Sequence, residues 1–265
     1  MAGATRMNTM WQRIAQSSLA ARLTGMAVVL VAWEAGVRGF APSFIATPSG
    51  IIAAVPESFS NPAMLHGLRV TLSAVAVGVV VSAVIGIIIG LAMGRMPWFA
   101  RLMRPYVEAS YATPMVAILP LLSIWFGYSA SARLATIIFA AIFPFIVNAY
   151  EGSRAVPVEF VEVARSFRAG WRAIWFGIAL PSALPYLVAG LRLAVGRALV
   201  AALIAEFYVS IDGIGYYILS STRAFAQNRA FVAVILLAVF ALAVDWATES
   251  GARRLLPWFR RDAAA

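Results

Sequence analysis

The residues whose chemistry points most clearly to a function are charged groups set within long apolar runs. Arg192, Arg197 and Glu206 all lie in one such run. Burying an ionised side chain away from water is costly, so such residues are candidates for a pathway that carries polar solutes. Arg192 and Arg197 are five residues apart, which places them about 140° apart around a helix, so they cannot share one narrow face. The alternative is a structural ion pair with Glu108 or Asp245.

Catalytic chemistry finds little support in the sequence. There is no Walker-type phosphate loop, so ATP cannot be bound and hydrolysed by that route. Cysteine is absent and the one histidine, His66, stands at the edge of an apolar run, which excludes thiolate metal sites and a Ser–His–Asp set. We therefore expect no catalytic residue, no metal site, and no cofactor bound by this chain.

A charged stretch, residues 151–185, interrupts the apolar sequence. Pro157 suits the first turn of a helix, where its missing N–H costs nothing. Apolar residues then recur at helical spacing on one face: Val156, Phe160, Val163, Ala164 and Phe167. Glycine at 170 breaks this pattern, and prolines follow at 181 and 185. The stretch predicts a short amphipathic helix with its apolar face on the membrane domain, a turn, a second short helix and a return to apolar sequence.

This stretch resembles the cytoplasmic coupling loop of ABC importer permeases. The family's EAA motif reads Glu162-Val163-Ala164 here, and its closing apolar residue and Leu-Pro read Ile178-Ala179-Leu180-Pro181. Two departures are Val163 for the middle alanine and Arg168 where the family has its turn glycine. The resemblance implies a coupling loop over residues 151–182. Its expected contacts with a partner ATPase are Glu159, Glu162, Ala164, Arg165, Phe167, Gly170, Leu180 and Pro181. The alternative is an amphipathic helix that merely lies at the membrane surface.

Composition indicates an all-α membrane protein with about six transmembrane helices. Of the 265 residues, 62% are hydrophobic and only 12% are charged, whereas soluble domains average about 25% charged. The net charge of +10 is typical of proteins that bind nucleic acid or anionic lipid. Because the apolar runs are long, we expect membrane lipid as the partner and not nucleic acid. We expect spans over residues 25–40, 70–94, 109–132, 134–150, 185–210 and 230–245. The connections are an outer loop with short helical pieces at 41–65, a basic loop at 95–104 and a loop at 211–228.

Small residues recur through the second expected span. Gly78, Gly86, Gly90 and Gly94 permit close helix contact, and Gly86 with Gly90 forms a GxxxG pattern. We favour general packing between membrane helices over a specific dimer face.

The arginines predict the orientation of the chain. The N-terminal segment, residues 95–104, the charged stretch and the C-terminal tail hold 3, 3, 4 and 4 of the 21 arginines. The positive-inside rule then places both termini and the coupling loop in the cytoplasm. We divide the chain into a cytoplasmic segment 1–24, a permease domain 25–248 and a basic cytoplasmic tail 249–265, with no cleavable signal.

The resemblance extends over nearly the whole chain, from about Trp33 to Leu256, and is greatest to permeases that take up nitrate, sulfonates and taurine. The order and spacing of the matching segments together make the resemblance strong. These segments are Thr47-Pro48-Ser49, Pro120-Leu121, Trp125-Phe126-Gly127, Phe143-Pro144 with Asn148, Leu180 to Pro185, Gly190-Leu191-Arg192, Ala205-Glu206 and Gly213 to Tyr216. Asn148, Arg192 and Glu206 match the family and are candidate pathway residues. Arg197 does not match, and we assign it to this protein's own choice of solute.

The resemblance implies a type I ABC importer permease fold and a transport subunit without ATPase activity of its own. Its implied partners are two ABC ATPase subunits that use ATP and Mg²⁺, a second copy of the chain, and a periplasmic or lipid-anchored substrate-binding protein. The expected solute is small and anionic, like nitrate, a sulfonate or taurine. Alternatives are a permease of the same group for a pyrimidine or vitamin precursor, a self-sufficient secondary transporter or channel, and a membrane-embedded structural protein. The last two leave the coupling motif without a purpose, and no inverted repeat supports a secondary transporter.

Overall fold

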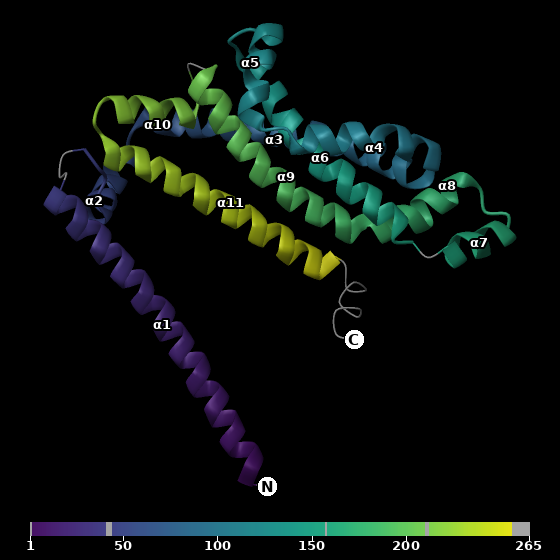
Figure 1. The fold of residues 1–265 in the computed structure, drawn as a ribbon, viewed down its shortest axis with the longest axis horizontal. Coiled ribbons are helices and arrows are strands. Elements are labelled where there is room, and N and C mark those ends of the chain that lie inside the picture. Colours follow the sequence, from purple (N-terminus) through teal and green to yellow (C-terminus); the bar gives the residue numbers. More distant parts are fainter. Residues whose placement is uncertain (1, 41–43, 157, 210–211, 256–265) are drawn as a thin grey trace. The chain divides into compact units, whose positions relative to one another are not determined.

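The computed structural model describes residues 2–40, 44–156, 158–209 and 212–255, and within these ranges the chain is helical, without a strand (Figure 1). The α-helices are α1 (Ala2–Phe40), α2 (Pro48–Phe59), α3 (Pro62–Arg95), α4 (Pro97–Ala112), α5 (Met115–Phe126), α6 (Ala130–Arg154), α7 (Val158–Ser166), α8 (Trp171–Ile174), α9 (Leu180–Tyr208), α10 (Ile214–Arg223) and α11 (Gln227–Leu255). A π-helical turn, Trp175–Ala179, joins α8 to α9.

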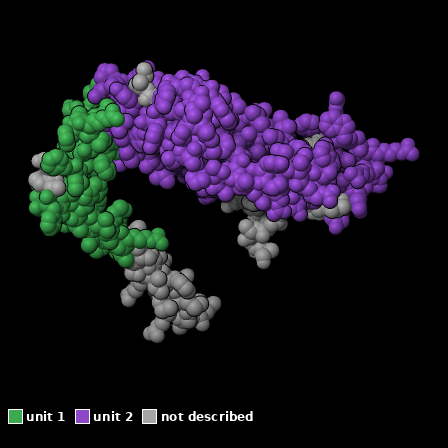
Figure 2. Space-filling view, turned by 45° about the horizontal axis from the view of Figure 1, so that its top comes forward, with its two compact units in different colours: residues 1–60, 220–232 green, residues 61–219, 233–265 purple. Residues whose placement is uncertain are grey.

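Among the described residues, five helical segments are long and apolar enough to cross a membrane. They are Ala20–Phe40, Pro62–Arg95, Ala130–Arg154, Trp171–Tyr208 and Gln227–Arg254, and the bent pair α4–α5 brings the number to six if it counts as one span. The expected all-α membrane protein with about six spans is therefore confirmed. The chain divides into two compact units, residues 1–60 with 220–232 and residues 61–219 with 233–265 (Figure 2).

The larger unit is built on the packing of α3, α6 and α9, which run side by side (Figure 1). Glycines on α3 face α6 so closely that a side chain would collide. A Cβ at Gly90 would lie 2.7 Å from Ala149 Cβ, and one at Gly86 would lie 2.9 Å from the carbonyl oxygen of Ile142. The GxxxG pattern thus packs helices within one chain, as the sequence predicted, because only glycine lets the two backbones come this close.

The third expected span, residues 109–132, is not a continuous helix. α4 ends at Ala112, Thr113 is extended (φ −68°, ψ 129°), and α5 leaves at 102° to α4. Pro114 explains the break, since the residue before a proline is pushed out of the helical region. The expected loop at 95–104 was wrong as well, because α4 begins at Pro97, whose ring suits a first helical turn.

Two further boundaries differ from the sequence prediction. The fifth span was expected to start near Pro185, but α9 begins at Leu180 and continues directly from the π-helical turn. Pro181 lies directly after the π-helical turn, at the second residue of α9, and the helix continues through it. The expected loop at 211–228 contains α10, whereas residues 210 and 211 lie outside the described residues.

Contacts within the smaller unit account for Glu34, the acidic residue in the first apolar segment. Glu34 of α1 accepts hydrogen bonds from the backbone N–H of Ser49 at 3.0 Å and from Ser49 Oγ at 2.6 Å, and it pairs with Arg38 at 2.6 Å. Thr47 caps the start of α2, where its Oγ1 accepts from the N–H of Gly50. A carboxylate at a helix N-terminus is favourable, so Thr47-Pro48-Ser49 and Glu34 together fasten α2 to α1.

The close contact of α3 with α6 generates a stability prediction. Gly90→Ala should lower the thermal unfolding temperature of the purified chain by about 3–10 °C, because the added methyl overfills the contact with Ala149. Gly251→Ala is the matched control, since among the described residues no neighbouring atom lies within 4 Å of the Cβ it would add in α11, and alanine favours a helix. Equal unfolding temperatures for both variants would show that the glycine contact is not a constraint.

Candidate functional site

The charged stretch folds as predicted into two short helices, but α7 turns only part of the predicted apolar face to the protein. Val161 is buried and Ala164 is half-buried, whereas Phe160, Val163 and Phe167 are 62%, 56% and 82% exposed. Of the predicted stripe, Val156 is buried just before α7 and Ala164 faces inward beside Val161. The other stripe residues, Phe160, Val163 and Phe167, are exposed and are free for another surface.

The turn after α7 is formed at Arg168 and not at Gly170. Arg168 has φ +56°, the left-handed region that glycine usually occupies. The N–H of Ala169 donates to the carbonyl of Ala164 at 2.9 Å, and the N–H of Arg168 donates to that of Arg165 at 2.8 Å. These two bonds are a Schellman motif, which ends a helix in a fixed direction. The turn thus keeps the shape that a glycine at 168 would give, and Gly170 lies outside it, exposed, just before α8.

The predicted coupling residues fall into two groups. Glu159, Glu162, Arg165 and Phe167 are exposed on α7 or its end. Leu180 and Pro181 are half-buried at the start of α9, and Leu180 packs on a cluster of Leu91, Ala149 and Ala183, contributed by α3, α6 and α9. The loop therefore presents a charged and aromatic surface at one end and is anchored in the helix core at the other.

Glu206 lies in a buried polar network. Its side chain is fully buried, and it accepts hydrogen bonds from Thr71 Oγ1 at 2.7 Å and from the N–H of Gly215 at 2.8 Å. Arg133 Nη1 lies 3.5 Å from Glu206 and 2.8 Å from Asp212. The network ties α9 to α3, to α6, to Asp212 before α10 and to the first turn of α10. A Cβ at Gly213 would lie 2.6 Å from Glu206 Oε2, so only glycine fits there.

Arg192 and Asn148 also have partners within the chain. Arg192 Nη2 lies 2.8 Å from Asp245 Oδ2 and 3.7 Å from Glu249 Oε2, so the ion pair with Asp245 weighed from the sequence is present. Asn148 Nδ2 donates to the carbonyl of Pro144, 2.8 Å away in the same helix. Arg192 therefore links α9 to α11, whereas the Asn148 side chain is satisfied within α6.

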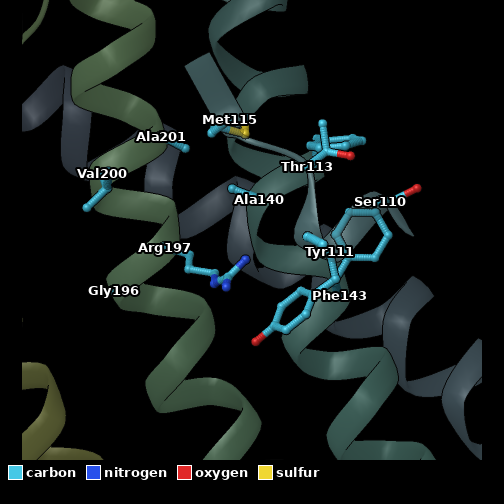
Figure 3. A pocket seen from close by; sticks show the side chains of 12 residues that line it. Ser110, Tyr111, Thr113, Met115, Ala140, Phe143, Gly196, Arg197, Val200 and Ala201 are labelled. Carbon is cyan, nitrogen blue, oxygen red and sulfur yellow. The ribbon is translucent and has the colours of Figure 1, made fainter. Parts of the chain in front are cut away.

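Arg197 has a different environment. It extends from α9 toward the aromatic side chains of Tyr111 and Phe143 (Figure 3). Its guanidinium carbon lies 4.0 Å from the centre of the Tyr111 ring. Among the described residues, no carboxylate lies within ion-pair distance of Arg197. A cation over an aromatic face is stabilised without losing its capacity to bind an anion.

The surrounding cavity has a volume of about 370 Å³. It lies where the break between α4 and α5 leaves space beside α6 and α9. Its wall combines the arginine and hydroxyl groups with apolar and aromatic side chains: Ser110, Tyr111, Thr113, Met115, Phe139, Phe143, Arg197 and Val200. Such a lining suits a small solute with one anionic group.

Several of these residues were not singled out from the sequence. Tyr111 and Thr113 stand just before Pro114, so the proline was the available signal that a helix breaks and leaves space there. Arg133 stands between the third and fourth expected spans, yet it is only 5% exposed and pairs with Asp212. Nothing local to Thr71 or Arg133 in the sequence indicates that they meet Glu206, which lies 135 and 73 residues away. In the part of the chain that the structure describes, no group of acidic residues and histidine could hold a metal ion.

Solved structures share this arrangement of helices. The methionine ABC transporter MetNI, in an inward-facing conformation, matches with a TM-score of 0.63 at 17% sequence identity, over 72% of this chain and 94% of that chain. The likeness confirms the fold of a type I ABC importer permease.

Curated relatives are similar over most of their length. The taurine transport system permease protein TauC of Escherichia coli is 25% identical over 88% of this chain and 87% of the relative. The formylaminopyrimidine transport permease protein ThiX of Halalkalibacterium halodurans is 27% identical over 88% of this chain and 94% of the relative. Residues 82–256, more than half of the chain, match the family described as the binding-protein-dependent transport system inner membrane component, and the chain belongs to this family of ABC importer permeases.

Proposed function

We propose that this permease is driven through α7, which docks on a partner ATPase in the cytoplasm. The observation that carries the proposal is the exposed surface of α7 and of the residue after it, with Phe160 and Phe167 on one side and Glu162 on another. Aromatic side chains are enriched on surfaces that a partner covers, and a charge such as Glu162 can orient the partner. A surface of this kind would otherwise remain in water with no compensating contact.

The structure around α7 is suited to transmit force. The Schellman turn at Arg168 fixes the direction in which the chain leaves α7, and α8 runs through the π-helical turn into α9 without a loop. Leu180 packs against α3 and α6 at that junction. A displacement of α7 would therefore move α9, which carries Arg197 at the cavity. Rigid packed elements pass on such displacements because close-packed interiors deform little.

We propose that the working importer contains two copies of this chain, two ATPase subunits that use ATP and Mg²⁺, and an extracytoplasmic binding protein, periplasmic or lipid-anchored. This chain would supply neither catalysis nor a cofactor, only half of the pathway. The family's description as binding-protein-dependent supports the binding protein. The absence of a phosphate loop from the sequence supports hydrolysis by a separate subunit.

We propose that both termini and residues 151–182 face the cytoplasm of a bacterium, with the chain spanning the inner membrane several times. The arginine distribution supports this orientation. The segment 1–24 and the tail 249–265 would then be cytoplasmic, although residues 256–265 lie outside the described residues.

We propose that the solute is small and anionic, of the sulfonate or taurine kind, and that Arg197 meets it at the cavity. The unpaired guanidinium among hydroxyl and aromatic groups supports this solute class. The name of TauC agrees with it. The name of ThiX keeps a neutral pyrimidine as the second candidate.

The coupling role predicts a specific defect. Glu162→Lys should lower ATPase association and transport-linked hydrolysis at least about tenfold, because it reverses a charge on the docking face. Docking of the binding protein, on the other side of the membrane, should be retained. Arg168→Gly is the control, since it suits the left-handed turn and leaves the docking face unchanged. Wild-type uptake and hydrolysis in Glu162→Lys would remove α7 as the coupling element.

The orientation predicts which introduced cysteines react with a membrane-impermeant thiol reagent in intact cells. The natural chain has no cysteine, so single replacements report unambiguously. Gly170→Cys, at an exposed position, should react only after the cells are opened, whereas the exposed Ala224→Cys should react in intact cells. The reverse pattern would invert the topology.

The solute proposal predicts a selective loss. Arg197→Gln should lower uptake of an anionic solute by about ten- to a hundredfold, since the charge-assisted contact is lost. Arg197→Lys should retain part of the uptake because the charge remains without the planar fork. ATPase association should stay normal in both variants. Anion uptake unaffected by Arg197→Gln would exclude this residue from solute binding.

A further inference from the structure

A second cavity, of about 400 Å³, lies where the start of α4 meets the ends of α3 and α6. Three guanidinium groups line it: Arg101 and Arg104 come from α4, and Arg154 is the last residue of α6. Tyr150 adds a hydroxyl group, and the buried side chains of Met93 and Ala100 form an apolar part of the wall. The cavity thus combines cationic groups with an apolar surface.

The charges in this cavity are not balanced within the chain. Arg104 Nε is paired with Glu108 Oε1 at 2.6 Å. Arg154 lies over the Tyr150 ring, 5.3 Å from its centre, and donates to the Tyr150 hydroxyl at 3.3 Å. Neither Arg101 nor Arg154 has a carboxylate within 4.0 Å in the described ranges. Two guanidinium groups are therefore available to an anion, and the planar guanidinium matches phosphate oxygens in pairs.

The position of the cavity favours a lipid over other sources of phosphate. It lies at the ends of the membrane-spanning segments Pro62–Arg95 and Ala130–Arg154. Next to it, α4 exposes Trp98, Leu102 and Tyr106, which are 61%, 53% and 65% exposed. Tryptophan and tyrosine prefer the headgroup level of a bilayer. A phospholipid would place its phosphate among the arginines and an acyl chain along the apolar side chains.

We propose that this cavity binds the headgroup phosphate of an anionic phospholipid in the cytoplasmic leaflet, with Arg101 and Arg154 as its main contacts. Basic pockets between membrane helices on the cytoplasmic side are suited to such headgroups. The bound lipid would join α4 to the ends of α3 and α6, the end of the helix core from which the loop to α7 leaves. This inference goes beyond the transported solute and does not depend on it, but its assignment to the cytoplasmic leaflet rests on the orientation proposed above.

Thermal unfolding of the purified full-length chain in neutral detergent tests the proposal. Added phosphatidylglycerol should raise the unfolding temperature at lower concentration than phosphatidylcholine, and soluble glycerol phosphate should have no effect at matched concentrations. The double variant Arg101→Gln/Arg154→Gln should need about 30-fold more phosphatidylglycerol for the same shift, from roughly five- to sixfold for each arginine. Arg172→Gln is the matched control, because Arg172 also lies over an aromatic ring, Trp171, but outside the cavity.

Three results would overturn the proposal. They are an unchanged lipid response in the double variant, an equal response to phosphatidylcholine, and an equal response to glycerol phosphate, the last of which would indicate a site for free phosphate. If the double variant does not fold without lipid, the exposed single variant Arg101→Gln carries the test with its smaller expected shift. Solute uptake is not read in this experiment, so its outcome is separate from that of the proposed transport function.

Discussion

A charge held at membrane depth must find a partner, and this constraint sorts the ionisable groups of the permease. Glu206 is satisfied by Thr71, Gly215 and Arg133, and Arg192 by Asp245 and Glu249. These pairs join helices that are distant in sequence, so charges that are costly alone become part of the fold. Arg197 differs because its neighbour is an aromatic ring at an open cavity. Its cost is offset in part by that ring, and an anionic solute would complete the compensation.

A second constraint is the space between helices. Without water in the bilayer there is little hydrophobic force to bring apolar helices together, so association depends on close packing. The glycines of α3 against α6 meet this need, and Gly190 does the same for α9, where an added Cβ would lie 3.1 Å from Asn148 Cβ. The break at Thr113 and Pro114 opens space between helices instead of closing it. It interrupts a helix that would otherwise fill the space, and the cavity beside Arg197 results.

Residues 151–182, which we propose as the coupling loop, connect α6 to α9 and so lie next to both features. Its outer helix presents side chains that this chain does not bury, and its inner end is packed into the core formed by α3, α6 and α9. Arg168 adopts the left-handed conformation at the turn that follows α7. A non-glycine residue adopts this conformation at a cost of roughly 1 kcal/mol. The turn sets the direction in which α7 points.

The sequence by itself determined the membrane class, most spans, the coupling stretch and the family resemblance, because these depend on local composition and on residues close in the chain. It also anticipated that Asp245 could neutralise Arg192, and that the α3 glycines pack helices. The break at Pro114, the helix at 97–112 and the direct start of α9 were decided by the local geometry of each proline. The tertiary structure alone decided which face of α7 is outward and which charges meet. Thr71, Arg133 and Glu206 are separated by long stretches of chain, and a pattern along the sequence carries no information about which distant side chains fold against one another.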